Sequence, residues 1–222
     1  MKGLLVAATG FEIEPCIKAL KQNAAWQVVI AGIGGTATAY ALTRFVEKFK
    51  PDVMVQAGIA GSFDKQLNLG DVVIAGSECF GDLGVIEEQR RKSIFELNLQ
   101  SASEKPFKGG RLQNPHKKLL EIVPLQVVDA VSVNEITTSI VDIDFYKDDL
   151  NVSIESMEGA AFHYVALMEN IPFLQVRSVS NYVGERDKAK WDVQLAVSNL
   201  NKEVLTIVEK LMNQNSPFGE FE

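Results

Sequence analysis

Residues 27–36 read Gln27-Val28-Val29-Ile30-Ala31-Gly32-Ile33-Gly34-Gly35-Thr36, an apolar run that ends in a glycine-rich turn. Val and Ile suit a buried strand, and the apolar spacing after the turn predicts a helix that runs to Phe49. The same alternation recurs along the chain. Further strands are expected at 4–8, 53–57, 72–75, 125–128 and 173–178, and further helices at 15–22, 159–169 and 193–211. The pattern predicts an α/β protein whose largely parallel sheet is covered by helices on both faces.

The length of 222 residues predicts one domain, assigned to residues 1–214, with a flexible tail at 215–222. A net charge of −7 argues against nucleic acid as a partner, and no apolar run is long enough to span a membrane. The two cysteines and two histidines lie far apart without ligand spacing. We therefore expect a cytoplasmic protein without a metal or a cofactor.

One segment, residues 87–115, interrupts the alternation. It is charged, contains Gly109-Gly110 and ends at Pro115. Because strands resume after it, we expect a flap or insertion inside the domain rather than a linker.

Glycine-rich turns follow two of the expected strands. The turn at 32–35 opens a helix, so its amides can face an oxygen-rich ligand. It does not fit a dinucleotide site, because it follows the second strand and lacks the third glycine at the required spacing. A second turn is expected at 56–62, after the next strand. Together they indicate a cleft at the carboxyl ends of the strands, although each turn alone equally suits a connection without a ligand.

Two carboxylates are candidates for chemistry. Glu14 precedes Pro15 at the entrance of the first helix, where it can activate a water or simply stabilise the helix dipole, and Glu12 is expected to be the solvated member of the pair. Glu158 begins a buried helix, where it requires hydrogen-bond partners. Sugar hydroxyls would satisfy it, with Met157 along the apolar sugar face, and a buried capping role is the alternative.

Asn181 ends a strand and enters a loop that contains Gly184. Its amide offers a donor and an acceptor together, which suits the edge of a heterocycle, although an asparagine in such a place is often a turn residue.

These elements, in this order, resemble the purine-nucleoside phosphorylase-like superfamily, which includes the methylthioadenosine nucleosidases. The resemblance covers nearly the whole chain. It rests on Glu12-x-Glu14, Gly32-Ile33-Gly34, Ala57-Gly58-Ile59-Ala60-Gly61, Gly70-Asp71-Val72-Val73, Asp129-Ala130, Met157-Glu158-Gly159-Ala160-Ala161 and Val176-Arg177-Ser178-Val179-Ser180-Asn181.

The resemblance implies a three-layer phosphorylase/hydrolase-like fold with a mixed central sheet flanked by helices. It gives Glu14 the role of activating the attacking water, Glu158 that of holding the ribose hydroxyls, and Met157 a place beside sugar and base. It also implies a small-molecule nucleoside substrate and a homo-oligomer, at least a dimer. Further substrate-binding positions are expected at Gly34, Ala57, Gly58 and Val133.

Asn181 departs from the methylthioadenosine nucleosidases, which usually have an aspartate there that donates a proton to the leaving adenine. An amide cannot act as a general acid, but it can bind the ring nitrogen and the 6-oxo group of hypoxanthine. Residues 180–191 resemble the futalosine hydrolases, which release hypoxanthine from futalosine in a route to menaquinone. Futalosine carries a carboxyphenyl ketone, for which we expect a cation and a ring. The candidates are Arg186, Lys188 or Arg111, with Trp191 or Phe107.

Three alternatives stay open: a methylthioadenosine/S-adenosylhomocysteine nucleosidase, a purine-nucleoside phosphorylase, and a nucleoside-binding module without catalysis. Phosphorolysis requires a cationic phosphate site, and the two glycine turns carry no arginine. Hydrolysis is therefore the expected reaction.

Overall fold

A computed structural model describes residues 1–88 and 90–213. The strands are β1 (Gly3–Ala7), β2 (Trp26–Ile30), β3 (Val53–Ser62), β4 (Val72–Phe80), β5 (Gly84–Glu87), β6 (Arg90–Ser93), β7 (Leu112–Gln113), β8 (Gln126–Ser132), β9 (Ile154–Ser156) and β10 (Phe173–Tyr182). The α-helices are α1 (Glu14–Leu20), α2 (Gly35–Phe49), α3 (Lys117–Leu120), α4 (Ile140–Asp144), α5 (Gly159–Glu169) and α6 (Val193–Asn213). A π-helix, η1 (Phe145–Asp149), and a 3₁₀-helix, η2 (Lys188–Lys190), complete the set. The tail predicted at 215–222 lies outside the described residues.

The central sheet is mixed, as expected. Its strands follow the order β10-β4-β8-β9-β3-β1-β2, and β7 pairs with β4. Strand β3 runs parallel to β1 and β10 but antiparallel to β9, and β4 runs antiparallel to β10. Because β10 also pairs with β3, the strands β3, β10, β4, β8 and β9 close into a ring. The ring brings β9 and β10 to either side of β3.

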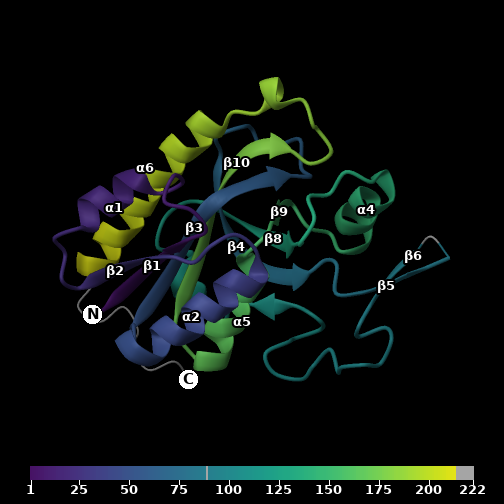
Figure 1. Ribbon diagram of the computed structural model, residues 1–222, viewed down its shortest axis with the longest axis horizontal. Coiled ribbons are helices and arrows are strands. Elements are labelled where there is room, and N and C mark those ends of the chain that lie inside the picture. Colours follow the sequence, from purple (N-terminus) through teal and green to yellow (C-terminus); the bar gives the residue numbers. More distant parts are fainter. Residues whose placement is uncertain (89, 214–222) are drawn as a thin grey trace.

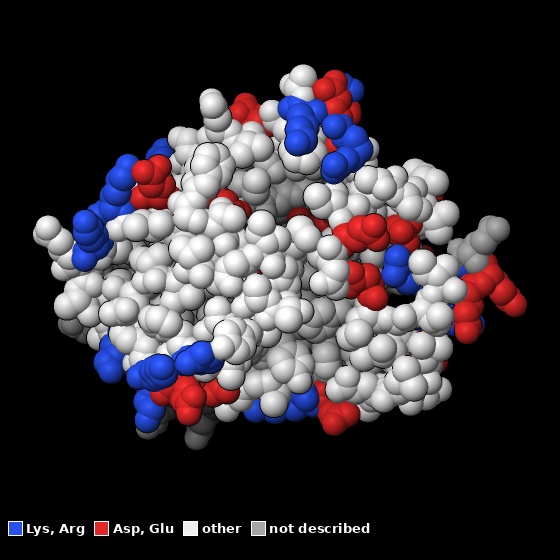
Figure 2. Space-filling view, in the orientation of Figure 1, with Lys and Arg blue, Asp and Glu red and all other residues white. Residues whose placement is uncertain are grey.

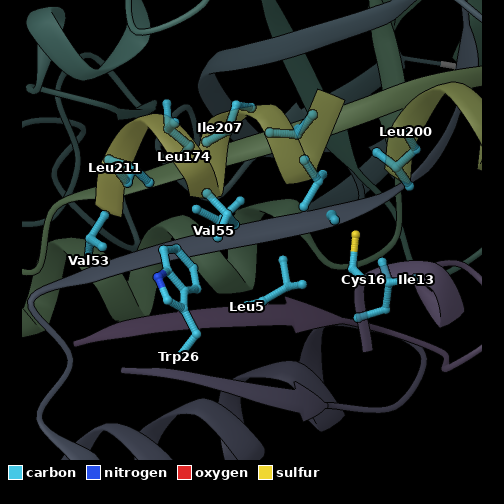
Figure 3. Packing of buried hydrophobic residues seen from close by; sticks show 14 of the residues in the cluster. Leu5, Ile13, Cys16, Trp26, Val53, Val55, Leu174, Leu200, Ile207 and Leu211 are labelled. Carbon is cyan, nitrogen blue, oxygen red and sulfur yellow. The ribbon is translucent and has the colours of Figure 1, made fainter. Parts of the chain in front are cut away.

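Helices cover the sheet on both faces, which gives three layers (Figure 1). The alternation of side chains along β1 shows how the core divides. Leu5 packs with α1 and α6 in one buried cluster, part of which Figure 3 shows, whereas Leu4 and Val6 pack with α2 and α5 in the other. Each buried leucine of this kind contributes about 1.5–3 kcal/mol. Helix α5 is buried along most of its length, and its bounds are those predicted.

The turn predicted at 56–62 is wrong, because β3 continues as a strand through Ser62. Glycines in this strand allow close approach of neighbouring side chains rather than a reversal of the chain. A Cβ at Gly58 would overlap Arg177 Nη1, and one at Gly61 would lie 3.3 Å from Asn181 Nδ2. Strands β4 and β10 likewise extend beyond the apolar runs that predicted them.

The charged segment between β4 and α3 contains the β5–β6 hairpin, which extends away from the main sheet (Figure 1), and the short strand β7. The aromatic rings of Phe95 and Phe107 pack edge to face at 5.0 Å, and Phe107 contacts Tyr164 of α5. These contacts pack the part of the charged segment that contains Phe95 and Phe107 against helix α5. Among the described residues, no helix is both long and apolar enough to cross a membrane.

Candidate active site

A cavity of about 290 Å³ lies where β1, β3 and β10 end, beside the start of α5. This is the edge of the sheet at which the sequence predicts a cleft. Its wall combines carboxylates, hydroxyls, an amide and apolar side chains. The lining residues are Ala8, Thr9, Phe11, Glu12, Ile33, Ile59, Ala60, Gly61, Ile136, Glu155, Ser156, Met157, Glu158, Ser180, Asn181 and Trp191.

Glu12 lies in the turn between β1 and α1 and is buried in the wall of this cavity. Its Oε2 accepts hydrogen bonds from the Thr9 amide at 3.1 Å and the Thr9 hydroxyl at 2.8 Å, and its Oε1 accepts from the Ile59 amide at 3.1 Å. A carboxylate has about four acceptor positions, so three fixed donors leave one free. Glu12 is therefore oriented and can still accept a hydrogen bond from a molecule in the cavity.

Glu14, the residue expected to activate water, is not part of the cavity wall. It lies in the first turn of α1 and forms an exposed ion pair with Lys18, 2.7 Å from Oε1 to Nζ. The hydrogen bond and charge of Lys18 lower the pKa of the Glu14 carboxyl. The placement of the two glutamates is thus the reverse of the prediction: Glu12 faces the cavity and Glu14 faces solvent. Helix α1 begins at Glu14, so Glu14 and Lys18 lie one turn apart on the same face of the helix, and that face is exposed to solvent.

Glu158 is buried beneath the cavity at the start of α5. Its Oε1 accepts a hydrogen bond from the Gly34 amide at 3.0 Å, and its Oε2 lies 3.5 Å from Arg177 Nη1. Its carboxylate does not cap its own helix, so the capping alternative is not what the structure shows. Two of its four acceptor positions remain for a ligand.

Gly34 and Gly58 bring backbone close to these carboxylates. Gly34 has φ of +88°, a conformation that favours glycine, and its amide contacts Glu158. Gly58 leaves room for Arg177, and a Cβ there would also lie 3.1 Å from Glu12 Oε1. Neither residue lines the cavity, and both position groups that do.

Arg177 lies behind the wall rather than in it, and is 1% exposed. Its Nη2 donates to Gln56 Oε1 at 3.1 Å and its Nη1 to the Ile59 carbonyl at 3.4 Å, in addition to the contact with Glu158. Both terminal nitrogens of the guanidinium are thus bound by protein groups, whereas its Nε is buried without a hydrogen-bond partner.

A second buried network supports the start of α5. The Ser132 hydroxyl accepts a hydrogen bond from the Ala160 amide at 2.8 Å and contacts Glu78 Oε2 at 3.2 Å, while Gln175 Nε2 donates to Glu78 Oε1 at 2.9 Å. Gly159 leaves the space that Glu78 and Gln175 occupy. Burial raises the pKa of the Glu78 carboxyl to about 7.

Asn181 is half-buried at the end of β10 and lines the cavity. Its Oδ1 accepts from the Ser180 hydroxyl at 2.8 Å and its Nδ2 donates to the Tyr182 carbonyl at 3.2 Å. One acceptor position and one N–H remain. The amide can therefore bind a heterocycle at two points.

Apolar side chains form the remainder of the wall. Met157 and Trp191, both expected at the site, line it together with Ile136, and Phe11 and Ile33 are largely exposed. The Trp191 indole is held by a hydrogen bond to the Glu185 carbonyl at 3.0 Å, and the Arg186 guanidinium lies over its ring at 5.7 Å. Arg186 is outside the wall but adjacent to it.

Several expected residues lie elsewhere. Ala57 belongs to the core beneath α6, and Val133 packs with Tyr146 in a separate buried cluster. Arg111 belongs to a different cavity beside the β5–β6 hairpin, Phe107 packs against α5, and Lys188 is exposed. None of the five lines the cavity that contains Glu12 and Glu158.

The model of one protein family, described as the phosphorylase superfamily, matches residues 22–212. The chain belongs to the phosphorylase superfamily. A curated relative in this superfamily is the 5′-methylthioadenosine/S-adenosylhomocysteine nucleosidase of Pseudoalteromonas translucida, 27% identical over 198 residues, 83% of this chain and 79% of that protein.

Solved structures share the fold. The futalosine hydrolase of Helicobacter pylori superposes with a TM-score of 0.80 at 16% identity, covering 95% of this chain and 98% of that one. The 5′-methylthioadenosine/S-adenosylhomocysteine nucleosidase of the same organism, with a bound butyl-thio-DADMe-Immucillin-A, superposes with a TM-score of 0.79 at 17% identity, covering 95% and 99%. At such identities the likeness establishes the fold.

Sequence reasoning missed three residues of the candidate site: Glu155, Glu12, which was expected to be solvated, and Arg177, which was quoted in a motif without a role. The spacing of Glu14 and Lys18 could have shown that Glu14 is the solvated glutamate, because charges four apart on a helix pair on its surface. Glu155 and Arg177 have no such local signal, since their partners come from other parts of the chain: Thr137 for Glu155, and Gln56, Ile59 and Glu158 for Arg177.

Proposed function

We propose that this chain is a nucleosidase that hydrolyses the N-glycosidic bond of futalosine and releases hypoxanthine. The observation that carries the proposal is the composition of one cavity wall. It contains two hydrogen-bonded carboxylates, Glu12 and Glu158, and an amide, Asn181, at the position where the methylthioadenosine nucleosidases usually have an acid.

Hydrolysis is favoured over phosphorolysis by the charge of the cavity. Glu12, Glu155 and Glu158 line it, and none of the described residues in its wall is a lysine or arginine. Arg177, the buried cation nearest the carboxylates, is engaged by Glu158 and Gln56. A phosphate dianion would meet like charge without a free cation to bind it.

In the proposed reaction Glu158 binds the ribose. Its two remaining acceptor positions match the two adjacent hydroxyls of the sugar, which donate to it while Gly34 and Arg177 hold the carboxylate in place. Met157 lies along the apolar face of the sugar. Fixing the ribose in this way favours the geometry in which the glycosidic bond lengthens to an oxocarbenium-like state.

Glu12 then activates the water. Its free acceptor position takes a hydrogen bond from a water molecule in the cavity, and the carboxylate removes a proton as the oxygen attacks the anomeric carbon. The Thr9 and Ile59 donors orient Glu12 for this step. The role given by the family resemblance to the second glutamate of Glu-x-Glu thus passes, in this proposal, to the first.

Asn181 stabilises the departing base. Once solvent has protonated N7 of the purine, the amide oxygen accepts that N7–H and the amide nitrogen donates to the 6-oxo group. An adenine protonated at N7 would instead present two donors, its N7–H and its 6-amino group. The amide oxygen can accept only one of them, and the amide nitrogen, itself a donor, cannot pair with the other. The amide therefore favours a 6-oxopurine as the leaving group.

The rim of the cavity suits the carboxyphenyl ketone of futalosine. Trp191 and Ile136 offer apolar surface, and Arg186 over the Trp191 ring supplies a cation for the carboxylate. Arg111 and Phe107 line other cavities, and Arg186 rather than Lys188 lies over the Trp191 ring, so Arg186 is the preferred cation.

A second candidate is a methylthioadenosine/S-adenosylhomocysteine nucleosidase, which is favoured by the sequence relatives. The relative of Pseudoalteromonas translucida, named for this activity, matches most of the chain. Asn181 argues against it, because the amide cannot donate the proton that a leaving adenine takes from an acid. The two candidates differ in the base released, which makes them separable by experiment.

We also propose that the protein is a homo-oligomer, at least a dimer. The centre of the face shown in Figure 2, toward the start of α2, is largely uncharged, with Lys, Arg, Asp and Glu over the end of α2 and toward the margins. Ile33 and Tyr40 on and beside α2 are 65% and 64% exposed. A second copy would cover these side chains, and light scattering of the purified chain measures the mass directly.

The experiment is hydrolysis in phosphate-free buffer with futalosine, methylthioadenosine and inosine in parallel, followed by chromatography of the released base. Hypoxanthine from futalosine, at a rate that added phosphate does not raise, is the expected result. Release of adenine from methylthioadenosine with futalosine untouched would establish the second candidate instead. Activity that requires phosphate would identify a phosphorylase, and binding of a nucleoside without release of base would identify a binding module.

A further inference from the structure

Three strands meet at one level of the cavity wall. Asn181 of β10 pairs with Gly61 of β3, and Gly61 pairs on its other side with Glu155 of β9. All three residues line the cavity. Residues paired on adjacent strands point to the same face of a sheet, and strands lie about 4.8 Å apart. Since Gly61 has no side chain, Asn181 Nδ2 and Val183 Cγ2 approach its backbone, 3.3 and 3.0 Å from the place that a Cβ would take. Glu155 lies on the strand at the other side of Gly61, with its Cα atom roughly 10 Å from that of Asn181.

The Glu155 carboxylate is only half satisfied. Its Oε1 accepts a hydrogen bond from the Thr137 amide at 3.2 Å, whereas its Oε2 is buried without a hydrogen-bond partner. The residue is 7% exposed. A buried carboxylate oxygen without a partner is costly, so such an atom in the wall of a binding cavity indicates an acceptor reserved for a ligand.

The purines differ at the atom that such an acceptor would contact. A 6-oxopurine carries a hydrogen on N1 beside its O6, whereas adenine has an unprotonated N1 beside its 6-amino group. An ionised carboxylate only accepts hydrogen bonds, so it matches N1–H and repels the lone pair of the adenine N1. The polar edge of a 6-oxopurine runs from N7 through O6 to N1, and can meet Asn181 at one end and Glu155 at the other.

We propose that Glu155 is a specificity-determining residue that selects 6-oxopurines, accepting the N1–H of a base that lies in the cavity between Glu155 and Asn181, while Asn181 binds the N7 and O6 side. This inference deepens the proposed function and rests on it, because it places the base of the nucleoside between these two side chains. It adds a second residue that distinguishes one base from another, on β9 rather than on β10, the strand of Asn181.

The surroundings of Glu155 give the selection a dependence on pH. Burial is the main cause that raises the pKa of the Glu155 carboxyl, and the nearby charges of Asp142 and Asp82 raise it further. The hydrogen bonds from Thr137 act in the opposite direction and lower this pKa. Arg91 is paired with Asp142 at 2.9 Å, and the Tyr146 hydroxyl stays neutral because burial raises its pKa as well. A protonated Glu155 donates rather than accepts, so the preference for a 6-oxopurine narrows as the pH falls.

The test is binding of the free bases hypoxanthine and adenine to the full chain by isothermal titration calorimetry at pH 8. The variant is Glu155→Gln, in which the side-chain oxygen can keep the Thr137 amide while the NH₂ group replaces the acceptor at Oε2 by a donor. Unchanged protein should bind hypoxanthine more tightly than adenine by at least about tenfold, the value of one charged hydrogen bond. The variant should lose or reverse this ratio, and the matched control Glu14→Gln, an exposed glutamate near the same end of the sheet, should keep it.

A ratio that is the same in Glu155→Gln and in the unchanged protein would overturn the inference, as would a failure of the unchanged protein to prefer hypoxanthine. Titrations of the unchanged protein from pH 8 to pH 5 test it without any substitution, and a ratio that does not narrow would count against it. The outcomes separate it from the proposed function. A protein that prefers hypoxanthine but hydrolyses only methylthioadenosine would overturn the proposed function alone, and one that hydrolyses futalosine without preferring hypoxanthine would overturn this inference alone.

Discussion

Arg177 Nη1 lies 3.5 Å from Glu158 Oε2, and the two side chains are 2% and 8% exposed. The pair joins β10 to the start of α5 beneath the cavity, so the carboxylate proposed to bind the ribose has its charge balanced from behind. A buried charge left without its partner is costly, whereas loss of both charges is often tolerated.

Replacement of Arg177 by methionine should therefore lower the free energy of unfolding by about 3–5 kcal/mol, because it leaves Glu158 uncompensated. Urea denaturation monitored by circular dichroism measures the change. Adding Glu158→Gln to this variant should restore part of the stability, and strictly additive losses in the double variant would show that the two groups do not interact.

The two glutamates of Glu12-x-Glu14 provide a matched pair of substitutions. Glu12→Gln should lower kcat by about a hundredfold or more, since general-base catalysis typically contributes at least this much. Glu14→Gln should leave kcat within about twofold, because its carboxylate pairs with Lys18 at the surface. Initial rates on futalosine measure both. If Glu14→Gln is the impaired variant, the assignment from burial is wrong.

Gly58→Ala should impair catalysis without adding any polar group. Its Cβ would overlap Arg177 Nη1 and lie 3.1 Å from Glu12 Oε1, which moves both groups from their positions. A displacement of this size can cost about a hundredfold in kcat/KM, and we expect a loss of at least about tenfold. Gly10→Ala is the control, because its Cβ would meet only Ile17 at 3.8 Å. Equal activity of the two variants would contradict the prediction.

Glu78 should make the protein less stable as the pH rises. Burial raises its pKa in the folded chain to about 7, above the value of 4.5 for a free carboxyl, so the folded state binds the proton more tightly than the unfolded state. Its contribution to stability is therefore present below pH 4.5 and is lost as the pH rises to about 7. His163 acts in the opposite sense, since burial lowers its pKa to about 4, and its contribution is lost as the pH falls through this range.

Comparison of the chain with Glu78→Gln isolates the glutamate, because His163 is common to both. The free energy of unfolding, measured in urea at pH 5, 6, 7 and 8, should favour the variant progressively as the pH rises. Parallel profiles would mean that Glu78 does not change its protonation in this range.

Asn181→Asp should move the substrate preference toward 6-aminopurine nucleosides. The carboxyl can donate a proton to the leaving adenine, a contribution of about a hundredfold or more in favourable cases. Release of adenine from methylthioadenosine should rise by at least about tenfold, most strongly at acidic pH, where the carboxyl is protonated. Unaltered adenine release with a loss of hypoxanthine release would show that Asn181 only binds the base.

The local pattern of apolar residues was sufficient to predict the strands and helices that form the layers of the fold. The apolar runs predict the positions of β1, β2 and β3, and the small and apolar residues from Gly159 predict α5 with its observed bounds. It was insufficient where glycines occur inside a strand. Gly58 and Gly61 suggest a turn when only neighbours in sequence are considered, but they serve as points of close approach for Arg177 and Asn181.

The sequence by itself determined the class of fold and the edge of the sheet that carries the cavity, because these follow from the period of apolar residues and from the ends of strands. The family resemblance added Met157, Glu158 and Asn181 to that site. Only the tertiary structure placed Glu12 in the cavity wall, since its carboxylate is held there by the amide of Ile59 of β3, whereas the spacing of Glu14 and Lys18 indicates no more than an exposed Glu14. The same holds for the row Asn181–Gly61–Glu155. Hydrogen-bond register across three strands from distant parts of the chain creates it, and no local preference specifies that register.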